Sequence, residues 1–179
     1  MALTTGEKIL APLTFKGDSL KQIGNDDGST GLGMIIFIIT SILTGLSFSE
    51  DLGDTALQRI VVGIAFQFLF LLFFSFLVNM FLKMFGGKSS TTMGVVRIFC
   101  FAYVWNIVGS IFALIGLSQI SNIIFLCFFI TLLLGLSSFT GVSIIAAFMA
   151  LLLAFAITVI ILFIIWLFLI VAIIALIFA

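Results

Sequence analysis

Three polar side chains lie at helical spacing within one apolar segment of this chain. Gln67, Ser75 and Asn79 are surrounded by Leu and Phe, at spacings of eight and four residues. Such spacings place them on one face of a helix. In hydrocarbon this face must turn inward, where it either hydrogen-bonds to other helices or lines a water-filled path. We expect Asn106 and Thr131, in later apolar segments, to be the hydrogen-bonding partners.

The residue types that carry most enzyme chemistry are missing from the apolar segments. The chain contains no His, which removes the commonest general base and a common metal ligand. Its seven acids are Glu7, Asp18, Asp26, Asp27, Glu50, Asp51 and Asp54. None lies at membrane depth, where an ion path usually has an ionisable residue. We therefore favour packing over transport for the polar face, and we expect no catalytic residue, no cofactor and no metal.

A short glycine-containing loop is similar to the end of a phosphate-binding loop. It consists of Gly86, Gly87, Lys88 and Ser89. A phosphate-binding loop also needs an earlier glycine, where this chain has Leu82, and a preceding β-strand. We interpret the segment as a basic connection between two helices.

Long uncharged runs must position these residues. Residues 98–179 contain no Lys, Arg, Asp, Glu or His, and 64% of the whole chain is hydrophobic. A membrane-spanning helix needs only ~20 apolar residues, whereas a water-soluble domain needs a charged face. Continuous apolar runs, without strict alternation, favour helices over a barrel. The sequence therefore predicts an all-α, polytopic helical bundle whose partner is the lipid bilayer and not nucleic acid.

Polar turns divide the apolar sequence into five predicted membrane spans. We place them at about residues 31–48, 60–81, 98–117, 123–136 and from 142 onward. The last run would be roughly 57 Å long as a helix, about twice one crossing. Residues 158–166 contain no Gly, Pro, Asn or charge to make a reversal tolerable in lipid. We therefore predict one long, tilted helix with Trp166 near an interface; a sixth span within residues 167–179 is the alternative.

Basic residues predict how the chain is oriented. Residues 1–30 are expected to form a short polar tail, and residues 31–179 the helical membrane domain. Six of the seven basic residues are Lys8, Lys16, Lys21, Lys83, Lys88 and Arg97. Because basic loops stay in the cytoplasm, we place the N-terminus and the 83–97 loop there, the acidic 50–54 loop outside, and the C-terminus outside. Lys83 and Arg97, at span ends, are expected to extend towards the membrane interface.

Small residues recur every four positions in the last predicted span. They are Ala146, Ala150, Ala154 and Thr158. Stripes of this kind let helix backbones approach closely. We expect this stripe to pack within one subunit, with packing between subunits as the alternative.

An ordered series of residues runs from the second predicted span to the fifth. It comprises Gly86, Gly87, Lys88, Arg97, Tyr103 and Trp105, then Gly135-Leu136-Ser137 and Ile144-Ile145-Ala146-Ala147. In this order, residues 81–166 resemble the membrane domain of the Yip1 family, and the short tail is similar to that of prokaryotic members. The resemblance implies five spans, a cytoplasmic N-terminus and no enzyme activity. It also marks Gly86, Gly87, Lys88, Arg97 and Tyr103 as family-pattern positions for partner contact.

Two functions from different classes stay open. The leading hypothesis is a non-enzymatic membrane scaffold that binds itself or another membrane protein. The alternative is a small transporter or channel subunit, with Gln67, Ser75 and Asn79 lining its path. Water would reach this polar face in a transporter and would be excluded from it in a scaffold. We expect the chain in the cell membrane if it is prokaryotic, and in the Golgi or endoplasmic reticulum if it is eukaryotic.

Overall fold

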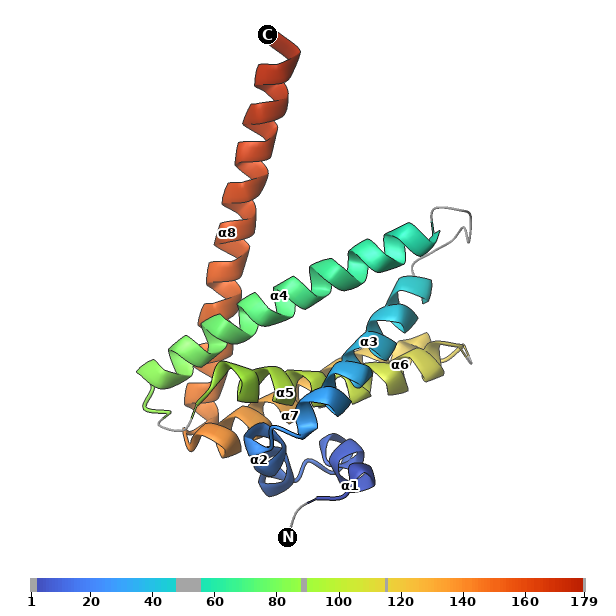
Figure 1. Ribbon diagram of the computed structural model, residues 1–179, viewed down its shortest axis with the longest axis vertical. Helices are drawn as coiled ribbons and strands as arrows, with labels where there is room; N and C mark the ends of the chain where they lie inside the picture. Colours follow the sequence, from blue (N-terminus) through green and yellow to red (C-terminus); the bar gives the residue numbers. More distant parts are fainter. Residues whose placement is uncertain (1–2, 48–55, 88–89, 115, 179) are drawn as a thin grey trace.

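The computed structural model describes residues 3–47, 56–87, 90–114 and 116–178. This part of the chain is helical and contains no strand, as predicted. Its helices are α1 (Thr5–Leu10), α2 (Gly17–Asn25), α3 (Ser29–Ser47), α4 (Ala56–Met84), α5 (Thr92–Ala102), α6 (Val104–Leu114), α7 (Ser121–Thr140) and α8 (Ile144–Phe178), with single 3-10 turns at Pro12–Thr14 and Ser118–Ile120. Figure 1 shows α1 and α2 at one end of the molecule and the end of α8 at the other.

Four of the described helical segments are long and apolar enough to cross a membrane. They are Ile60–Met84, Thr92–Ala113, Asn122–Thr140 and Ile144–Ala172. A fifth would come from α2 and α3 together, which are bent by 107° at the break between them. The predicted spans from the second to the fifth thus correspond to helical segments, and the first corresponds to α3. This set of helices is compatible with a multi-pass membrane protein.

The third predicted span differs from the expectation because it is broken. Helix α5 begins at Thr92, six residues before the predicted start, since the Thr91 side chain accepts a hydrogen bond from the backbone N–H of Gly94 (3.1 Å) and caps the helix. The helix then ends at Ala102. The carbonyl of Tyr103 accepts hydrogen bonds from the N–H groups of Asn106 and Ile107 and starts α6.

Helix α8 is continuous from Ile144 to Phe178. The reversal near residues 158–166 that a sixth span requires is therefore not found in the described chain, and the prediction of one long helix is confirmed. Gly141 separates α7 from α8. Its φ of 75° and its N–H bond to the carbonyl of Ser137 form a left-handed helix cap that favours glycine.

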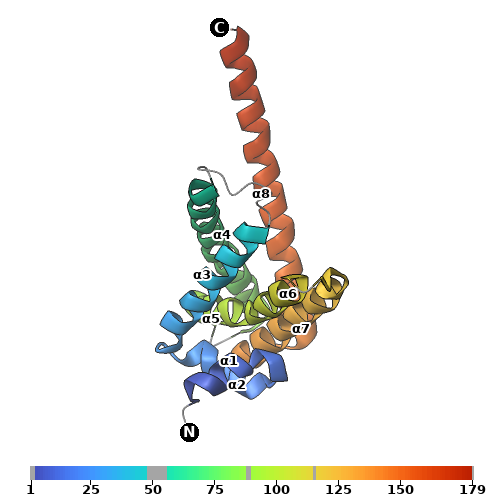
Figure 2. The same cartoon turned by 90° about the vertical axis from the view of Figure 1, so that its right-hand side faces the viewer.

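The small-residue stripe of α8 packs within the chain, as expected. Ala150 and Ala154 are completely buried and Thr158 is nearly so. The hydroxyl of Thr158 donates to the carbonyl of Ala154 (2.7 Å), which satisfies this polar group inside the helix. Around the stripe, α8 packs against α4 and α7. Figure 2 shows that the rest of α8 extends away from the other helices.

The polar tail is folded, a feature that the sequence analysis did not predict. Thr4 and Glu7 form a capping box at the start of α1. Leu20 and Ile23 on α2 are completely buried, because α2 packs against α7 and α5. A Cβ atom on Gly24 would lie 2.6 Å from the ring of Phe139, so only glycine permits this approach of α2 to α7.

Candidate functional site

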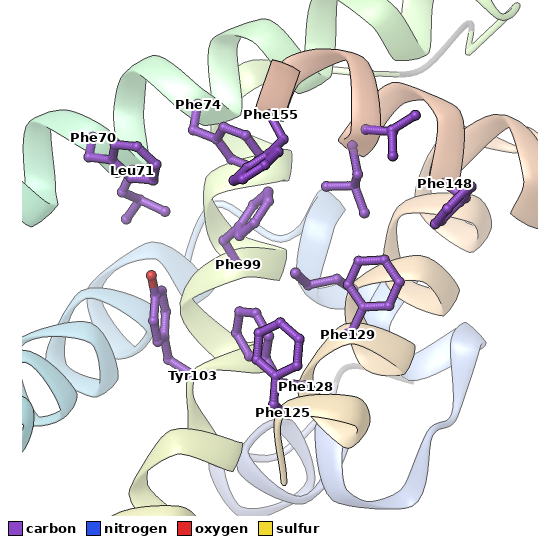
Figure 3. Close-up of a pocket in the computed structure, with 13 residues that line it drawn as sticks. Phe70, Leu71, Phe74, Phe99, Tyr103, Phe125, Phe128, Phe129, Phe148 and Phe155 are labelled. Carbon is purple, nitrogen blue, oxygen red and sulfur yellow. The ribbon is translucent and has the colours of Figure 1, made fainter. Parts of the chain in front are cut away.

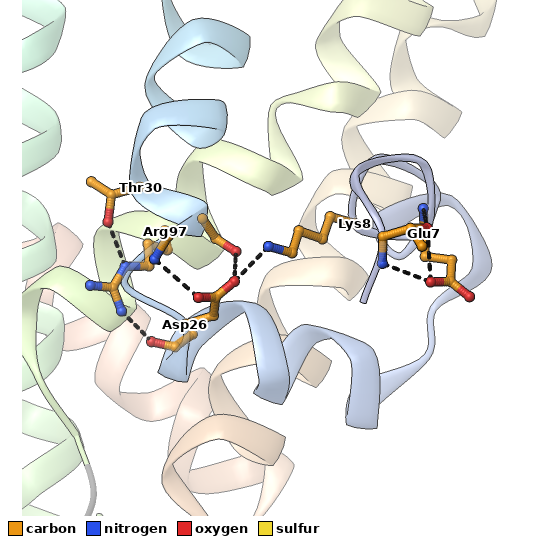
Figure 4. Close-up of polar contacts among 9 residues, drawn as sticks. Glu7, Lys8, Asp26, Thr30 and Arg97 are labelled. Carbon is orange, nitrogen blue, oxygen red and sulfur yellow. Dashed lines mark hydrogen bonds and ion pairs between the residues drawn. The ribbon is translucent and has the colours of Figure 1, made fainter. Parts of the chain in front are cut away.

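A buried arginine joins the folded tail to the long apolar helices. Arg97, on α5, is only 6% exposed. Its Nε donates to Thr30 Oγ1 and its Nη1 donates to the carbonyl of Gly24, both at 2.8 Å. A further bond joins Nη2 to Asp27. Figure 4 shows the guanidinium pointing into the junction of α2 and α3.

Arg97 is therefore enclosed by the tail, and it does not extend freely from the end of its span as the sequence had suggested. The bend between α2 and α3 leaves a backbone carbonyl and a hydroxyl facing α5, and the planar guanidinium satisfies both at once. A buried charge needs such partners. Lys83, by contrast, is exposed at the end of α4.

A second ion pair holds the tail together beside Arg97. Lys8 Nζ lies 2.5 Å from Asp26 Oδ2, and the Ser29 hydroxyl donates to the same oxygen at 2.7 Å. The N–H of Gly28 donates to Asp26 Oδ1 (3.0 Å). The hydrogen bond from Lys8, followed by that from Ser29, lowers the pKa of Asp26 to about 2. The contact therefore links α1 to the start of α3 (Figure 4).

A third contact fixes the tail to the far helices. Trp105 Nε1 donates to Thr131 Oγ1 (2.9 Å), and Thr131 Oγ1 donates to the carbonyl of Pro12 (3.2 Å). The Trp105 ring also stacks on Phe15, with centroids 5.5 Å apart. Thr131 is thus a partner of the tail and not of the polar face on α4. No local signal in the sequence predicts this contact, because its members are separated by up to 119 positions.

The polar face predicted on α4 is only partly as expected. Asn79 is buried, but its partners are Ser90 and Thr92, from the segment that leads into α5. Its amide donates to Thr92 Oγ1 at 3.1 Å. The predicted pairing of this face with Asn106 and Thr131 is therefore wrong, because the nearest polar groups come from the adjoining loop.

Ser75 and Gln67 are the other predicted members of this face, and Asn106 was one of its expected partners. Ser75 is completely buried, and its hydroxyl has no hydrogen-bond partner among the described residues. Gln67 is half-buried on the same helix, and Asn106 is half-buried on α6. The carbonyl of Asn106 accepts a hydrogen bond from the Ser110 hydroxyl (2.9 Å). Burial of Ser75 and Asn79 agrees with a packing face.

The glycine-containing loop terminates α4. Gly86 has a φ of 93°, a left-handed conformation that favours glycine at a helix end. The N–H of Gly87 bonds to the carbonyl of Leu82 (2.9 Å), and a Cβ on Gly87 would lie 2.9 Å from that oxygen. These glycines thus have a structural role, whereas Lys88 lies outside the described residues.

A large apolar cavity lies between α4, α5, α7 and α8 (Figure 3). Its volume is about 420 Å³. Thirteen side chains line it: Phe70, Leu71, Phe74, Phe99, Tyr103, Phe125, Phe128, Phe129, Leu132, Phe148, Leu151, Leu152 and Phe155. We call this space the phenylalanine cavity. No sequence motif predicts it, although the 23 phenylalanines of the chain are a compositional sign of aromatic packing.

Edge-to-face ring contacts hold the walls of the phenylalanine cavity. Phe74 on α4 meets Phe99 on α5 with ring centroids 5.6 Å apart and an interplanar angle of 80°. Phe129 on α7 meets Phe148 on α8 at 6.1 Å and 88°. Tyr103, the family-pattern aromatic residue, contacts Phe37 and Phe128 with its ring. Such pairs stabilise beyond their buried area, so the cavity is built into the packing of four helices.

Comparisons with known proteins identify no relative. The chain matches no protein-family profile, no curated protein and no solved structure. Membership of the Yip1 family therefore stays a prediction. Among the described residues, no three His, Cys, Asp or Glu side chains come together as a metal site.

Proposed function

We propose that this chain is a non-enzymatic, multi-pass membrane scaffold that associates with a second membrane protein or a second copy of itself through α8. The observation that carries the proposal is the exposure of α8 beyond its packed stripe. Large apolar side chains are exposed along the helix there: Val159, Ile160, Leu162, Phe163, Ile164, Ile165, Trp166, Leu167, Phe168, Leu169 and Val171. Only Leu162 and Ile165 of this set line a pocket with side chains of α4, so most of this part of α8 is left for lipid or for a partner.

The length of α8 favours a protein partner over lipid alone. Its 35 residues form a helix of about 52 Å at ~1.5 Å per residue. The hydrocarbon core is ~30 Å thick. A tilt of ~40°, the upper end of the usual range, still leaves a projection of about 40 Å. Roughly 10 Å of apolar helix then lies outside the core, and a neighbouring membrane helix would cover it.

The family-pattern positions are less suited to partner contact. Arg97 is buried in contacts to the tail, and Gly87 is buried at the end of α4. Tyr103 is half-buried among aromatic rings. We therefore assign partner binding to α8, and keep the Yip1 resemblance as support for a scaffold without enzyme activity.

Cross-linking in native membranes tests the scaffold proposal. Both native cysteines are replaced by alanine, and Phe168→Cys is introduced at a side chain that is 72% exposed on α8. We expect a short bifunctional maleimide to give one discrete product, either a dimer or a heterocomplex. Val62→Cys is the control, because Val62 is similarly exposed but lies on α4. Equal cross-linking of both variants, falling in parallel as lipid is added, would show random collision and refute the proposal.

We further propose five spans, with the N-terminus and the 83–97 loop in the cytoplasm. The placement of six of the seven basic residues supports this orientation. Lys21, Gln58 and Lys83 are all exposed, so single cysteines there can react with an impermeant thiol reagent. We expect positions 21 and 83 to react from one side and position 58 from the other. Reaction of all three from one side would exclude the five-span arrangement.

A further inference from the structure

We propose that the phenylalanine cavity is a binding site for one acyl chain of a bilayer phospholipid. The site is distinct from the α8 surface assigned to a protein partner, because it lies at the packed part of α8. Its floor is buried: Leu71, Phe99, Leu132 and Leu151 are each at most 6% exposed. Its rim is open, and Phe125 and Phe155 are at least 60% exposed. An occupant can thus enter from the surface and reach a closed inner end.

The lining chemistry selects an apolar occupant. Tyr103 carries the only polar side-chain group among the thirteen lining residues, and none of them is charged. A buried water needs two to four polar partners, and apolar cavities stay dry. A metal ion, a nucleotide or another charged solute would be left without ligands. Hydrocarbon is the remaining class.

The size and shape of the cavity fit a flexible chain. A volume of about 420 Å³ lies within the ~300–1,000 Å³ range of ligand pockets, which are mostly apolar. If the cavity were empty, its lining would lose van der Waals contacts on one side. The edge-to-face pairs Phe74–Phe99 and Phe129–Phe148 hold two walls in place. A chain with freely rotating bonds can follow the remaining space.

The surroundings point to a phospholipid as the source of this chain. Every lining residue belongs to a helical segment long and apolar enough to cross a membrane, so the rim would face the hydrocarbon of the bilayer. Among the described residues that line the cavity there is no Lys or Arg, so the cavity itself offers no partner for the carboxylate of a free fatty acid. A phospholipid, the main component of the bilayer, would insert only its tail and leave its charged headgroup at the membrane surface.

Photolabelling of the full chain in phosphatidylcholine vesicles tests the site. The probe is phosphatidylcholine with a diazirine near the end of one acyl chain, and adducts are mapped by mass spectrometry. We expect adducts on residues 125–132 and 148–155 to persist when detergent dilutes the bulk lipid. Labelling of the exposed part of α8 should instead fall in proportion to the dilution, as for bulk lipid. A proportional fall at both places would overturn the proposal.

Filling the cavity gives the matched comparison. Leu151→Trp adds bulk at the buried floor, and Leu152→Trp adds it at a rim position that is 49% exposed and tolerates change more readily. Leu169→Trp makes the same replacement on the exposed part of α8. We expect the first two variants to lose the labelling of residues 125–132 and 148–155 that resists detergent dilution, and the third variant to keep it. Unchanged labelling in Leu152→Trp, with thermal unfolding like that of the parent, would refute the site.

A second probe distinguishes the lipid source. A diazirine-bearing free fatty acid is offered at the same mole fraction in the same vesicles. We expect its labelling of residues 125–132 and 148–155 to fall as detergent dilutes the bulk lipid. Fatty-acid labelling that resists dilution and excludes the phospholipid probe would overturn the assignment to a phospholipid chain.

Discussion

Replacing Arg97 with alanine removes three contacts between α5 and the junction of α2 and α3. Two of them, to Thr30 and to the carbonyl of Gly24, are 2.8 Å bonds from a side chain that is only 6% exposed. Bonds to charged groups contribute ~1.5–3 kcal/mol each. The pair with Asp27 adds little, because that carboxylate is 94% exposed. We therefore expect the variant to lose about 3–5 kcal/mol, as when one partner of a buried polar pair is removed.

Two assays measure this loss in detergent. Thermal unfolding reports global stability, and limited trypsin digestion at the exposed residues Lys16 and Lys21 reports release of the tail. Arg97→Ala should unfold at lower temperature and be cleaved faster at both sites, because a released tail can adopt the extended conformation that trypsin needs. Asp27→Asn, which breaks only the exposed pair, should behave nearly like the parent. The reasoning fails if Arg97→Ala keeps the parent's unfolding temperature and trypsin resistance, or if Asp27→Asn destabilises the protein equally.

Three further perturbations test other parts of the structure. Ala150→Leu should destabilise the bundle by ~1–3 kcal/mol through overpacking. This loss should exceed that of Leu152→Ala, since position 150 is fully buried and position 152 is half-exposed. Equal unfolding temperatures of the two variants would contradict the packing of the stripe. The pKa of Asp26 is lowered to about 2 in the folded protein, whereas it is ~3.9 in an unfolded chain. The pairing with Lys8 therefore stabilises the tail fully above pH ~3.9, and this stabilisation is lost as the pH falls through about 2. Trypsin is inactive at such low pH, so pepsin is the protease of choice. Digestion of the tail by pepsin should accelerate as the pH falls between the two pKa values of Asp26. A digestion rate that follows only the pH dependence of pepsin's own activity would contradict the prediction. Reconstituted protein should pass no ions or small solutes above empty liposomes, because Ser75 and Asn79 are buried in packing; a flux abolished by Asn79→Leu in a folded variant would favour the transport alternative.

Local signals predict the apolar helices well. Long uncharged runs imply helices because backbone groups must be paired in lipid, and α4, α7 and α8 follow them. The small-residue stripe at Ala150 and Ala154 also predicts packing correctly, because close approach needs small side chains wherever the partner lies.

Contacts between distant segments could not be predicted in the same way. Leu20 and Ile23 have the spacing of one helix face, which is a local sign that α2 packs on something. Nothing local shows that this partner is α7, or that Arg97 meets a carbonyl 73 positions away. The phenylalanine cavity is harder still to predict from the sequence, because its existence depends on how the side chains of four helices leave the space between them unfilled.

The break at Tyr103 divides the third apolar segment into two units, and the folded tail contacts both of them. Residues 94–102 of α5 are all buried, whereas residues 105–110 of α6 are half-buried. The carbonyl of Tyr103 starts a new series of hydrogen bonds. Arg97 anchors one unit to the tail through the carbonyl of Gly24, and Trp105 anchors the other by stacking on Phe15. The tail thus bridges the break from outside, so that releasing the tail would free the segment on both sides of Tyr103.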